Sequence, residues 1–227
     1  MKKRIKIQGF LIFLAIIISI PLSKFLFPHW KEEALDEFLD ALGIGMVLFG
    51  FLFRIAARGY KAEVSPDGKK LIIDGLYGFL RNPMYFGTLL IGLGINLILF
   101  EWWAFILFFI IFLLIYIRQM RKEENDLYRR FGEEFKNYCK ITPRYFPKVF
   151  NVNLRDYLFF KWSWVKKELP SLVGVIAVII AAEIWEDVRI FGYNEFREEL
   201  LELPLIIILF VSIFSLFYGK KDIARKR

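Results

Sequence analysis

The chain contains 227 residues, of which 57% are hydrophobic, 19% are aromatic and 25% are charged, with a formal net charge of +8. A single cysteine, Cys139, excludes an internal disulfide and a cysteine-based metal cluster, and a single histidine, His29, excludes a multi-histidine metal site. Long apolar runs alternate with clusters of charged residues, which is typical of an integral membrane protein. Because the basic residues flank the apolar runs, the positive charge indicates membrane orientation and not binding to nucleic acid.

Six apolar runs meet or approach the roughly 20 residues that cross a bilayer. They cover residues 5–27, 38–57, 84–100, 102–117, 169–185 and 203–218. The third and fourth runs are separated only by Glu101 and its neighbours, which predicts a tight helical hairpin. Basic residues precede the first run, as in a signal peptide, but the run is long and no small-residue cleavage site follows Pro21. We therefore expect the first run to be a retained helix.

The placement of lysine and arginine predicts the orientation of these spans. In a six-span arrangement, 28 of the 32 basic residues lie on one side, in the N-terminal segment, in residues 54–81 and 118–167, and in the tail 220–227. The opposite side has an excess of acidic residues. We predict an integral, multi-pass membrane protein with both termini in the cytoplasm, since a five-span arrangement would place the basic tail outside.

Two stretches lack the composition of a span. Residues 63–80 form a polar loop with a turn signal at residues 66–68, and the apolar residues around this turn suggest a small hairpin of strands. Residues 153–168 mix aromatic and basic side chains, which predicts an amphipathic helix lying in the membrane interface. The predicted organisation is a two-span region at 1–62, a catalytic core at 63–150, an interfacial helix at 151–168 and a second two-span region at 169–227.

The first distinctive polar block runs from residue 75 into the third span. Pro83 suits the first turn of a helix, and Asn82 is a candidate N-cap. Free amides at a helix start attract anionic groups, and Arg81 adds positive charge, so a ligand carboxylate or phosphate can dock there. The alternative is a capped helix that simply enters the membrane.

The second block continues from the fourth span. Glu123 and Glu124 follow the membrane boundary by about one turn, and Gly132 can stop this helix. A solvated, charged helix face is the alternative interpretation. Because the predicted hairpin brings the two blocks to the same membrane face, the two acids can meet the cationic parts of a ligand and the residue 81–82 helix start its anionic part. A zwitterionic cofactor that also carries a sulfonium would suit such a pocket.

Residues 71–147 resemble the isoprenylcysteine carboxyl methyltransferase and phospholipid methyltransferase family of integral membrane methyltransferases. The matching elements are Gly-Leu-Tyr at 75–77, Arg-Asn-Pro-Met-Tyr at 81–85 with Gly87, Glu123 and Glu124 with Leu127, Phe-Gly-Glu-Glu at 131–134, Tyr138, and the segment from Pro143 to Pro147. This resemblance implies an all-α transmembrane bundle that binds S-adenosylmethionine at the cytoplasmic mouth of its helices.

The resemblance also implies roles for individual residues. The cofactor would contact the backbone of Leu71 and Ile72 together with Tyr77, Asn82, Pro83, Met84, Tyr85 and Glu123. Catalytic roles would fall to Arg81, Tyr85 and Glu124, and substrate binding to Arg118, Gln119 and Arg121. The family usually has histidine at the position of Asn82, so no imidazole chemistry is available there. Prenylcysteine enzymes have arginine at the position of Gln119, which weakens the case for a prenylcysteine carboxylate as substrate.

Three functions remain to be compared. The favoured one is methyl transfer from a sulfonium to a lipid or other membrane-embedded acceptor, with no metal. A carboxylate acceptor needs no general base, whereas an amine must lose a proton, which Glu124 or Tyr85 can take. The runner-up is a nicotinamide-dependent enzyme of the membrane sterol reductase type. A transport protein is disfavoured, because the ionisable residues Asp40 and Glu183 lie near span ends and not in mid-span.

Overall fold

The computed structural model of the protein describes residues 33–147, 157–158 and 160–190. Within these residues the chain is mostly helical and contains no strand, as the all-α prediction requires. The helices are α3 (Glu33–Val64), α4 (Leu76–Phe79), α5 (Pro83–Leu99), α6 (Trp102–Ile141) and α7 (Trp162–Ile190). The apolar runs predicted at 38–57, 84–100, 102–117 and 169–185 are helical, except that α5 ends one residue early, before Phe100. The runs at 5–27 and 203–218 lie outside the described residues.

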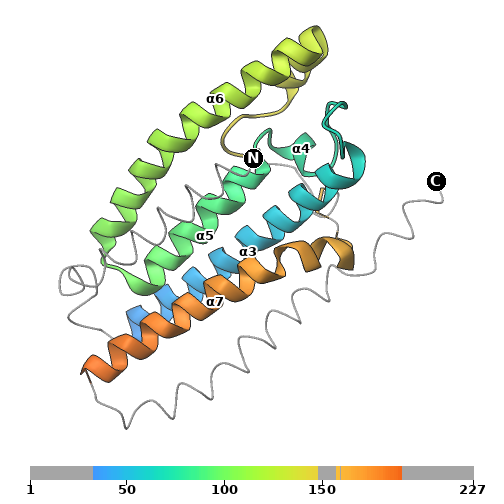
Figure 1. Cartoon of the computed structure of the whole chain (residues 1–227). Helices are drawn as coiled ribbons and strands as arrows, with labels where there is room; N and C mark the ends of the chain where they lie inside the picture. Colours follow the sequence, from blue (N-terminus) through green and yellow to red (C-terminus); the bar gives the residue numbers. More distant parts are fainter. Residues whose placement is uncertain (1–32, 148–156, 159, 191–227) are drawn as a thin grey trace.

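Two helices in the described part of the chain are long and apolar enough to cross a membrane, Phe38–Val64 and Trp102–Ile141. Pro83–Leu99 and Glu168–Ile180 are apolar but shorter. The long helices lie side by side in the order α6, α5, α3 and α7 (Figure 1). The predicted hairpin is confirmed, because α5 ends before Phe100 and α6 begins at Trp102.

Four glycines allow α3 and α5 to cross unusually closely. A Cβ atom added to Gly50 would lie 2.6 Å from the Gly87 carbonyl oxygen, and one added to Gly87 would lie 2.6 Å from the Gly50 carbonyl oxygen. Gly43 and Gly94 repeat this reciprocal contact two turns away, at 2.8 Å and 2.5 Å. Because the partners pair in opposite order along the chain, α3 and α5 are antiparallel. Small residues of this kind let membrane helices pack backbone to backbone.

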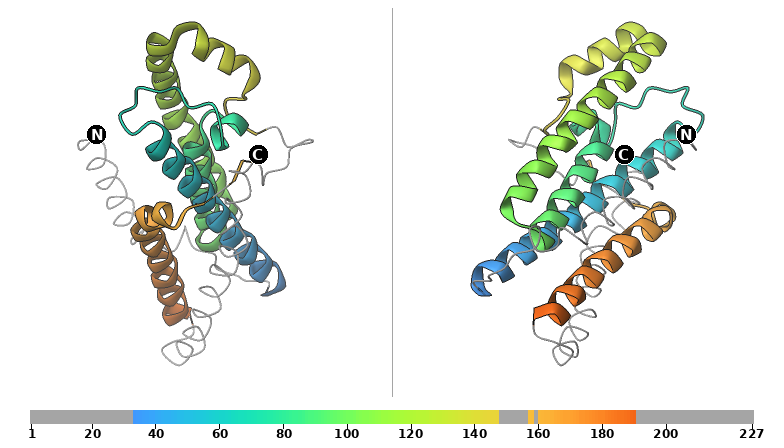
Figure 2. Two further views of the ribbon diagram at one scale, coloured as in Figure 1. Left: turned by 90° about the vertical axis from the view of Figure 1, so that its right-hand side faces the viewer. Right: turned by 60° about the vertical axis from the view of Figure 1, so that its left-hand side comes forward.

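The long α6 consists of two helices joined at Gly132. This residue has φ 51° and ψ −122°, a conformation that favours glycine, and the chain changes direction there. The prediction that Gly132 ends the helix leaving the fourth span is therefore confirmed. The segment after Gly132, residues 133–141, folds back over α4 and the start of α5 (Figures 1 and 2).

The interfacial helix predicted at 153–168 is only partly covered by the described residues. From Trp162 onward the chain forms the first turns of α7, which is continuous with the fifth predicted span. Pro170 lies inside this helix, and α7 bends near its start (Figure 2). In the described part of the aromatic segment, Phe160 and Trp164 are buried, whereas Trp162 is half exposed. A Cβ atom on Gly59 would overlap the ring of Trp164.

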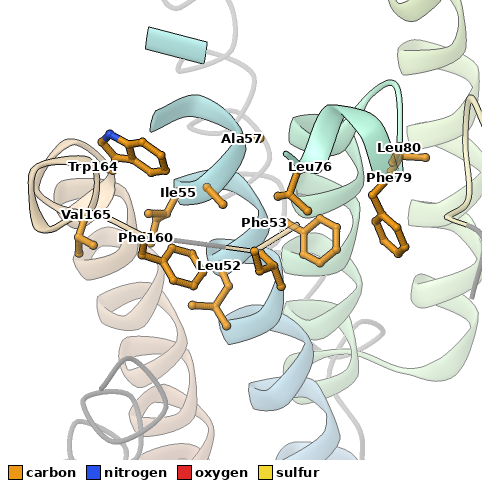
Figure 3. Packing of buried hydrophobic residues seen from close by; sticks show 12 residues of the cluster. Leu52, Phe53, Ile55, Ala57, Leu76, Phe79, Leu80, Phe160, Trp164 and Val165 are labelled. Carbon is orange, nitrogen blue, oxygen red and sulfur yellow. The ribbon is translucent and has the colours of Figure 1, made fainter. Parts of the chain in front are cut away.

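The core nearest to the start of α7 joins α3, α4 and α7 (Figure 3). Phe53, Leu76 and Leu80 are fully or almost fully buried in it. A second cluster joins α3, α5 and α7 further along the bundle, and a third joins α5 to the first part of α6. The first cluster fixes the position of α4, and the other two hold α5 against its neighbours.

The small strand hairpin suggested around the turn at 66–68 is wrong. The turn itself exists, since the Gly68 amide donates to the Ser65 carbonyl and Gly68 has φ 71°. However, the Ser65 hydroxyl accepts a hydrogen bond from the Lys70 amide and donates one to the Lys70 carbonyl. A side chain thus satisfies backbone groups that a strand ladder would have paired, and residues 71–73 have no regular secondary structure.

Candidate functional site

The start of α5 has the predicted N-cap residue but not the predicted cap. Asn82 occupies the N-cap position and Pro83 the first turn, yet the Asn82 side chain makes no capping hydrogen bond. Its Nδ2 instead donates to Glu124 Oε1 at 3.2 Å and to the Arg144 carbonyl at 3.3 Å. The Asn82 carbonyl accepts the amides of Tyr85 and Phe86. Asn82 therefore connects α5 to α6, and its side chain leaves the helix start uncapped.

Glu124 is the centre of a buried ionic cluster. Its carboxylate lies 2.6 Å from Arg144 Nη2 and 3.4 Å from Arg81 Nη1, and its side chain is only 8% exposed. Arg81 Nη1 also donates to the Cys139 sulfur at 2.9 Å. The Nε atoms of both arginines are buried without a hydrogen-bond partner. Two guanidinium groups thus share one carboxylate, and the cluster carries an excess of one positive charge.

Glu123 belongs to a separate set of contacts. The Tyr85 hydroxyl donates to Glu123 Oε1 at 2.7 Å, and Gln119 Nε2 donates to the same oxygen at 2.7 Å. Tyr85 also packs edge-on against the ring of Tyr116. Because adjacent helical residues point about 100° apart, Glu123 and Glu124 reach different partners.

The residues after Gly132 close the end of the site over α4. The Tyr138 hydroxyl donates to the Tyr77 carbonyl at 2.6 Å, and the Arg81 amide donates to the Pro143 carbonyl at 3.0 Å. Phe135 and Tyr138 pack on Leu71 in a small apolar cluster. Burial, and secondly the negative charge of Glu123, raise the pKa of the Tyr77 hydroxyl well above its ordinary value, so this hydroxyl remains protonated.

A pocket of about 170 Å³ lies between these elements. All eight residues expected to contact a cofactor line it, namely Leu71, Ile72, Tyr77, Asn82, Pro83, Met84, Tyr85 and Glu123. All three expected catalytic residues, Arg81, Tyr85 and Glu124, line it as well. The structure therefore brings residues from the loop, α4, α5 and α6 to one cavity.

The three expected substrate-binding residues do not lie together. Gln119 points towards Glu123, beside the pocket. Arg118 and Arg121 instead border a shallow hollow on another face of α6, with Lys122, Asn125, Asp126 and Arg129.

Several pocket residues have no counterpart among the expected site residues. Lys61, Lys70 and Arg130 add cationic groups to the lining, and Phe135 adds an apolar wall. Arg144 is the main charged partner of Glu124, although it lies twenty residues further along the chain. The sequence signal that could have indicated this contact is Gly132, because the change of direction there returns the segment containing Arg144 to the α5–α6 hairpin. Among the described residues, no group of three histidine, cysteine or acidic side chains could hold a metal ion.

Comparison with known proteins connects this site to a family. Residues 39–134 match the family described as phospholipid methyltransferase. The protein-S-isoprenylcysteine O-methyltransferase of Schizosaccharomyces pombe is 28% identical over 131 residues, which cover 56% of this chain and 54% of that protein. The Mus musculus protein of the same name is 27% identical over 134 residues, covering 55% of this chain and 47% of the relative. A probable protein-S-isoprenylcysteine O-methyltransferase of Oryza sativa subsp. indica is 28% identical over 123 residues, covering 51% and 63%.

The chain thus spans about half to two thirds of the length of these relatives. No solved structure matches it. The matched residues 39–134 contain most of α3, all of α4 and α5 and most of α6, with every pocket-lining residue except Phe135 and Tyr138.

Proposed function

We propose that this chain, whose residues 39–134 match the phospholipid methyltransferase family, is a membrane enzyme that transfers a methyl group from S-adenosylmethionine to a lipid-like acceptor. The observation that carries the proposal is the pocket at the start of α5. One cavity collects the family-matched segments 71–85 and 123–127, which the sequence separates by about forty residues.

The residues that line the pocket suit the different parts of this cofactor. Leu71, Leu127 and Phe135 provide an apolar wall for the adenine ring. Glu123 provides a carboxylate for ribose hydroxyls or the ammonium group, and Lys61, Lys70 and Arg130 provide cations for the carboxylate group. The cofactor supplies an activated methyl group on a sulfonium, so the protein mainly has to position the acceptor and exclude water.

The two acidic residues then have different roles. Glu124 is engaged by Arg81, Arg144 and Asn82, and these contacts hold the start of α5 against α6. Glu123 accepts a hydrogen bond from the Tyr85 hydroxyl. The Tyr85 oxygen keeps lone pairs, so it can accept a hydrogen bond from the substrate that receives the methyl group. If the acceptor is an amine, Tyr85 takes its proton and passes the hydroxyl proton to Glu123. A carboxylate acceptor needs neither step.

The nicotinamide-dependent alternative is not favoured. The relatives named above are methyltransferases, and the pocket contains the paired acids that this alternative does not require. Calorimetry on the detergent-purified protein distinguishes the two functions. We expect S-adenosylhomocysteine to bind and NADPH not to bind, and the reverse result would replace the methyltransferase proposal.

The acceptor class is tested with a labelled methyl donor. A phospholipid amine and a farnesylated cysteine carboxylate are offered in separate reactions, each beside a short-chain, water-soluble analogue. We expect activity with one long-chain acceptor and a steep loss with its short-chain analogue. Equal rates on the long-chain and short-chain forms would indicate a soluble substrate instead.

The proposed topology is multi-pass with both termini in the cytoplasm, as the distribution of lysine and arginine indicates. Single cysteines introduced by Lys3→Cys and Arg225→Cys in a Cys139→Ala background report it. We expect an impermeant thiol reagent to label neither position in intact cells. Labelling of either one from outside would overturn the six-span arrangement.

A further inference from the structure

The outward face of α6 is continuously exposed over its apolar half. Large apolar side chains recur on this face every three or four residues, which places them along one side of the helix. They are Trp103, Ile106, Leu107, Ile110, Ile111, Leu114 and Ile115. The opposite side of the same helix packs on α5 through Phe112 and its neighbours. This exposed apolar face fits contact with lipid chains.

The same face becomes basic where the apolar run ends. Continuing the spacing of three or four residues leads to four exposed cations, which we call the basic stripe: Arg118, Arg121, Lys122 and Arg129. The one acidic residue among them is Asp126, so the face keeps an excess of three positive charges. Among the residues that the structure describes, no carboxylate forms a salt bridge with any of the four cations.

The depth of the stripe matches a lipid headgroup layer. Arg118 directly follows Ile117, the last residue of the apolar run. At about 1.5 Å per residue, Lys122 lies roughly 7 Å beyond that boundary and Arg129 roughly 18 Å beyond it. The polar layer of each leaflet is roughly 5–8 Å thick. Arg118, Arg121 and Lys122 thus fall within this layer, whereas Arg129 lies in the solution next to it.

We propose that Arg118, Arg121 and Lys122 form a binding site for anionic phospholipid headgroups of the cytoplasmic leaflet. The occupant is a lipid because the cations continue a face whose preceding part is apolar and exposed. Guanidinium and ammonium groups donate charge-assisted hydrogen bonds, which the phosphate and carboxylate oxygens of the headgroups accept. The site is distinct from the pocket, since on the same helix turns Glu123 accepts the hydrogen bonds of Tyr85 and Gln119 on the pocket side. This inference does not depend on methyl transfer.

The test measures which lipids surround the full-length protein. The protein is placed in nanodiscs of phosphatidylcholine that contain a small fraction of spin-labelled phosphatidylserine or spin-labelled phosphatidylcholine. Electron paramagnetic resonance then gives the relative association constant of the two labelled lipids. A single surface cation favours an anionic lipid by about fivefold. We expect the wild type to prefer phosphatidylserine by about this factor or more, and 1 M salt to abolish the preference.

Variants show which cations cause the preference for phosphatidylserine. The triple variant R118Q/R121Q/K122Q should bring the ratio close to one, and Arg129→Gln should lower it only slightly. The matched control K69Q/K136Q/K140Q removes three exposed cations elsewhere and should keep the wild-type ratio. Thermal unfolding verifies that each variant is folded. A wild type without preference, a triple variant that keeps it, or a control that loses as much would each overturn the proposal.

Discussion

The Tyr85 hydroxyl and the Glu123 carboxylate are joined by a hydrogen bond of 2.7 Å, which connects the first turn of α5 to the middle of α6. The two residues are 38 positions apart in the sequence. Both acids of the pair line the pocket. The bond orients Glu123, whereas Glu124 is engaged by Arg81, Arg144 and Asn82, which hold α5 against α6.

The first prediction concerns Glu123. We expect Glu123→Gln to weaken S-adenosylhomocysteine binding by about 10- to 150-fold, since a charge-assisted hydrogen bond contributes roughly 1.5–3 kcal/mol. Isothermal calorimetry measures the change. Glu133→Gln is the matched control, because Glu133 is an exposed acid of α6 that pairs with Lys136. Unchanged affinity in a folded Glu123→Gln protein would remove this residue from the cofactor site.

A second prediction separates Tyr85 from Glu123. Tyr85→Phe removes the hydroxyl, while Gln119 still holds the Glu123 carboxylate. With an amine acceptor we expect turnover to fall by about 100-fold, in the usual range for a lost proton-transfer group. With a carboxylate acceptor we expect little change. Initial rates with each acceptor measure this, and Tyr128→Phe on the exposed side of α6 is the control. An equal loss with both acceptors would indicate a role in binding.

A third prediction concerns Glu124. Glu124→Gln leaves Arg81 and Arg144 without their shared carboxylate, and Arg81 is only 13% exposed. Stranding a buried charge costs about 3–5 kcal/mol, and because Arg144 is partly solvated we expect a loss of about 2 kcal/mol in the free energy of unfolding. Denaturation in mixed micelles measures it. The loss should exceed that of Glu123→Gln, and the reverse order would contradict the structural role of Glu124.

A fourth prediction concerns the ionic cluster between α3 and α7. Glu168 is 1% exposed and pairs with Arg54 and Arg58, and Arg54 also donates to the Thr88 hydroxyl at 2.8 Å. We expect Glu168→Gln to destabilise the protein by about 3 kcal/mol, again because charges lose their partner in a buried place. The control is Glu63→Gln, which breaks the exposed pair with Lys161 and should cost less than about 1 kcal/mol. Similar losses in the two variants would mean that Glu168 is effectively solvated.

A fifth prediction concerns the α3–α5 crossing. An alanine at Gly50 or Gly87 would bring Cβ to 2.6 Å from a backbone oxygen, which only a shift of the helices can relieve. We expect each substitution to lower the free energy of unfolding by about 1–3 kcal/mol. Gly45→Ala on the same helix meets nothing within 4 Å and should be neutral or stabilising by up to about 1 kcal/mol. Equal effects at Gly45 and Gly50 would contradict the close crossing.

The sequence predicted local features better than contacts between distant segments. Glu101 as the break in the hairpin, Pro83 at a helix start and Gly132 as the end of a helix were all predictable, because each acts on its own neighbours. The Arg54–Glu168 pair was not, since periodicity does not reveal which face of α3 meets α7. The strand hairpin after Val64 failed because one serine hydroxyl satisfied the backbone there.

The candidate site shows the same division. Asn82 was correctly placed at the helix start, but its side chain turned to Glu124, a partner 42 residues away. Arg144 was missed as the main partner of Glu124 because the return of the chain after Gly132 brings it there. Arg118 and Gln119 are neighbours in sequence, yet they lie on different faces of α6. Sequence position alone assigned substrate binding to both residues and could not show that only Gln119 lies beside the pocket.

The reciprocal contacts of Gly50 with Gly87 and of Gly43 with Gly94 also limit how the pocket can open. Backbones in such contact cannot slide along each other. The helices α3 and α5 therefore form one rigid wall of the pocket, which carries Lys61 and the residues from Asn82 to Tyr85. The opposite wall of the pocket is the segment that follows Gly132. Tyr138 and Pro143 of this segment are hydrogen-bonded to Tyr77 and Arg81, and Arg144 pairs with Glu124 of α6. For the proposed cofactor, we therefore expect entry and exit to proceed by rotation of this segment about Gly132, while α3 and α5 keep their positions.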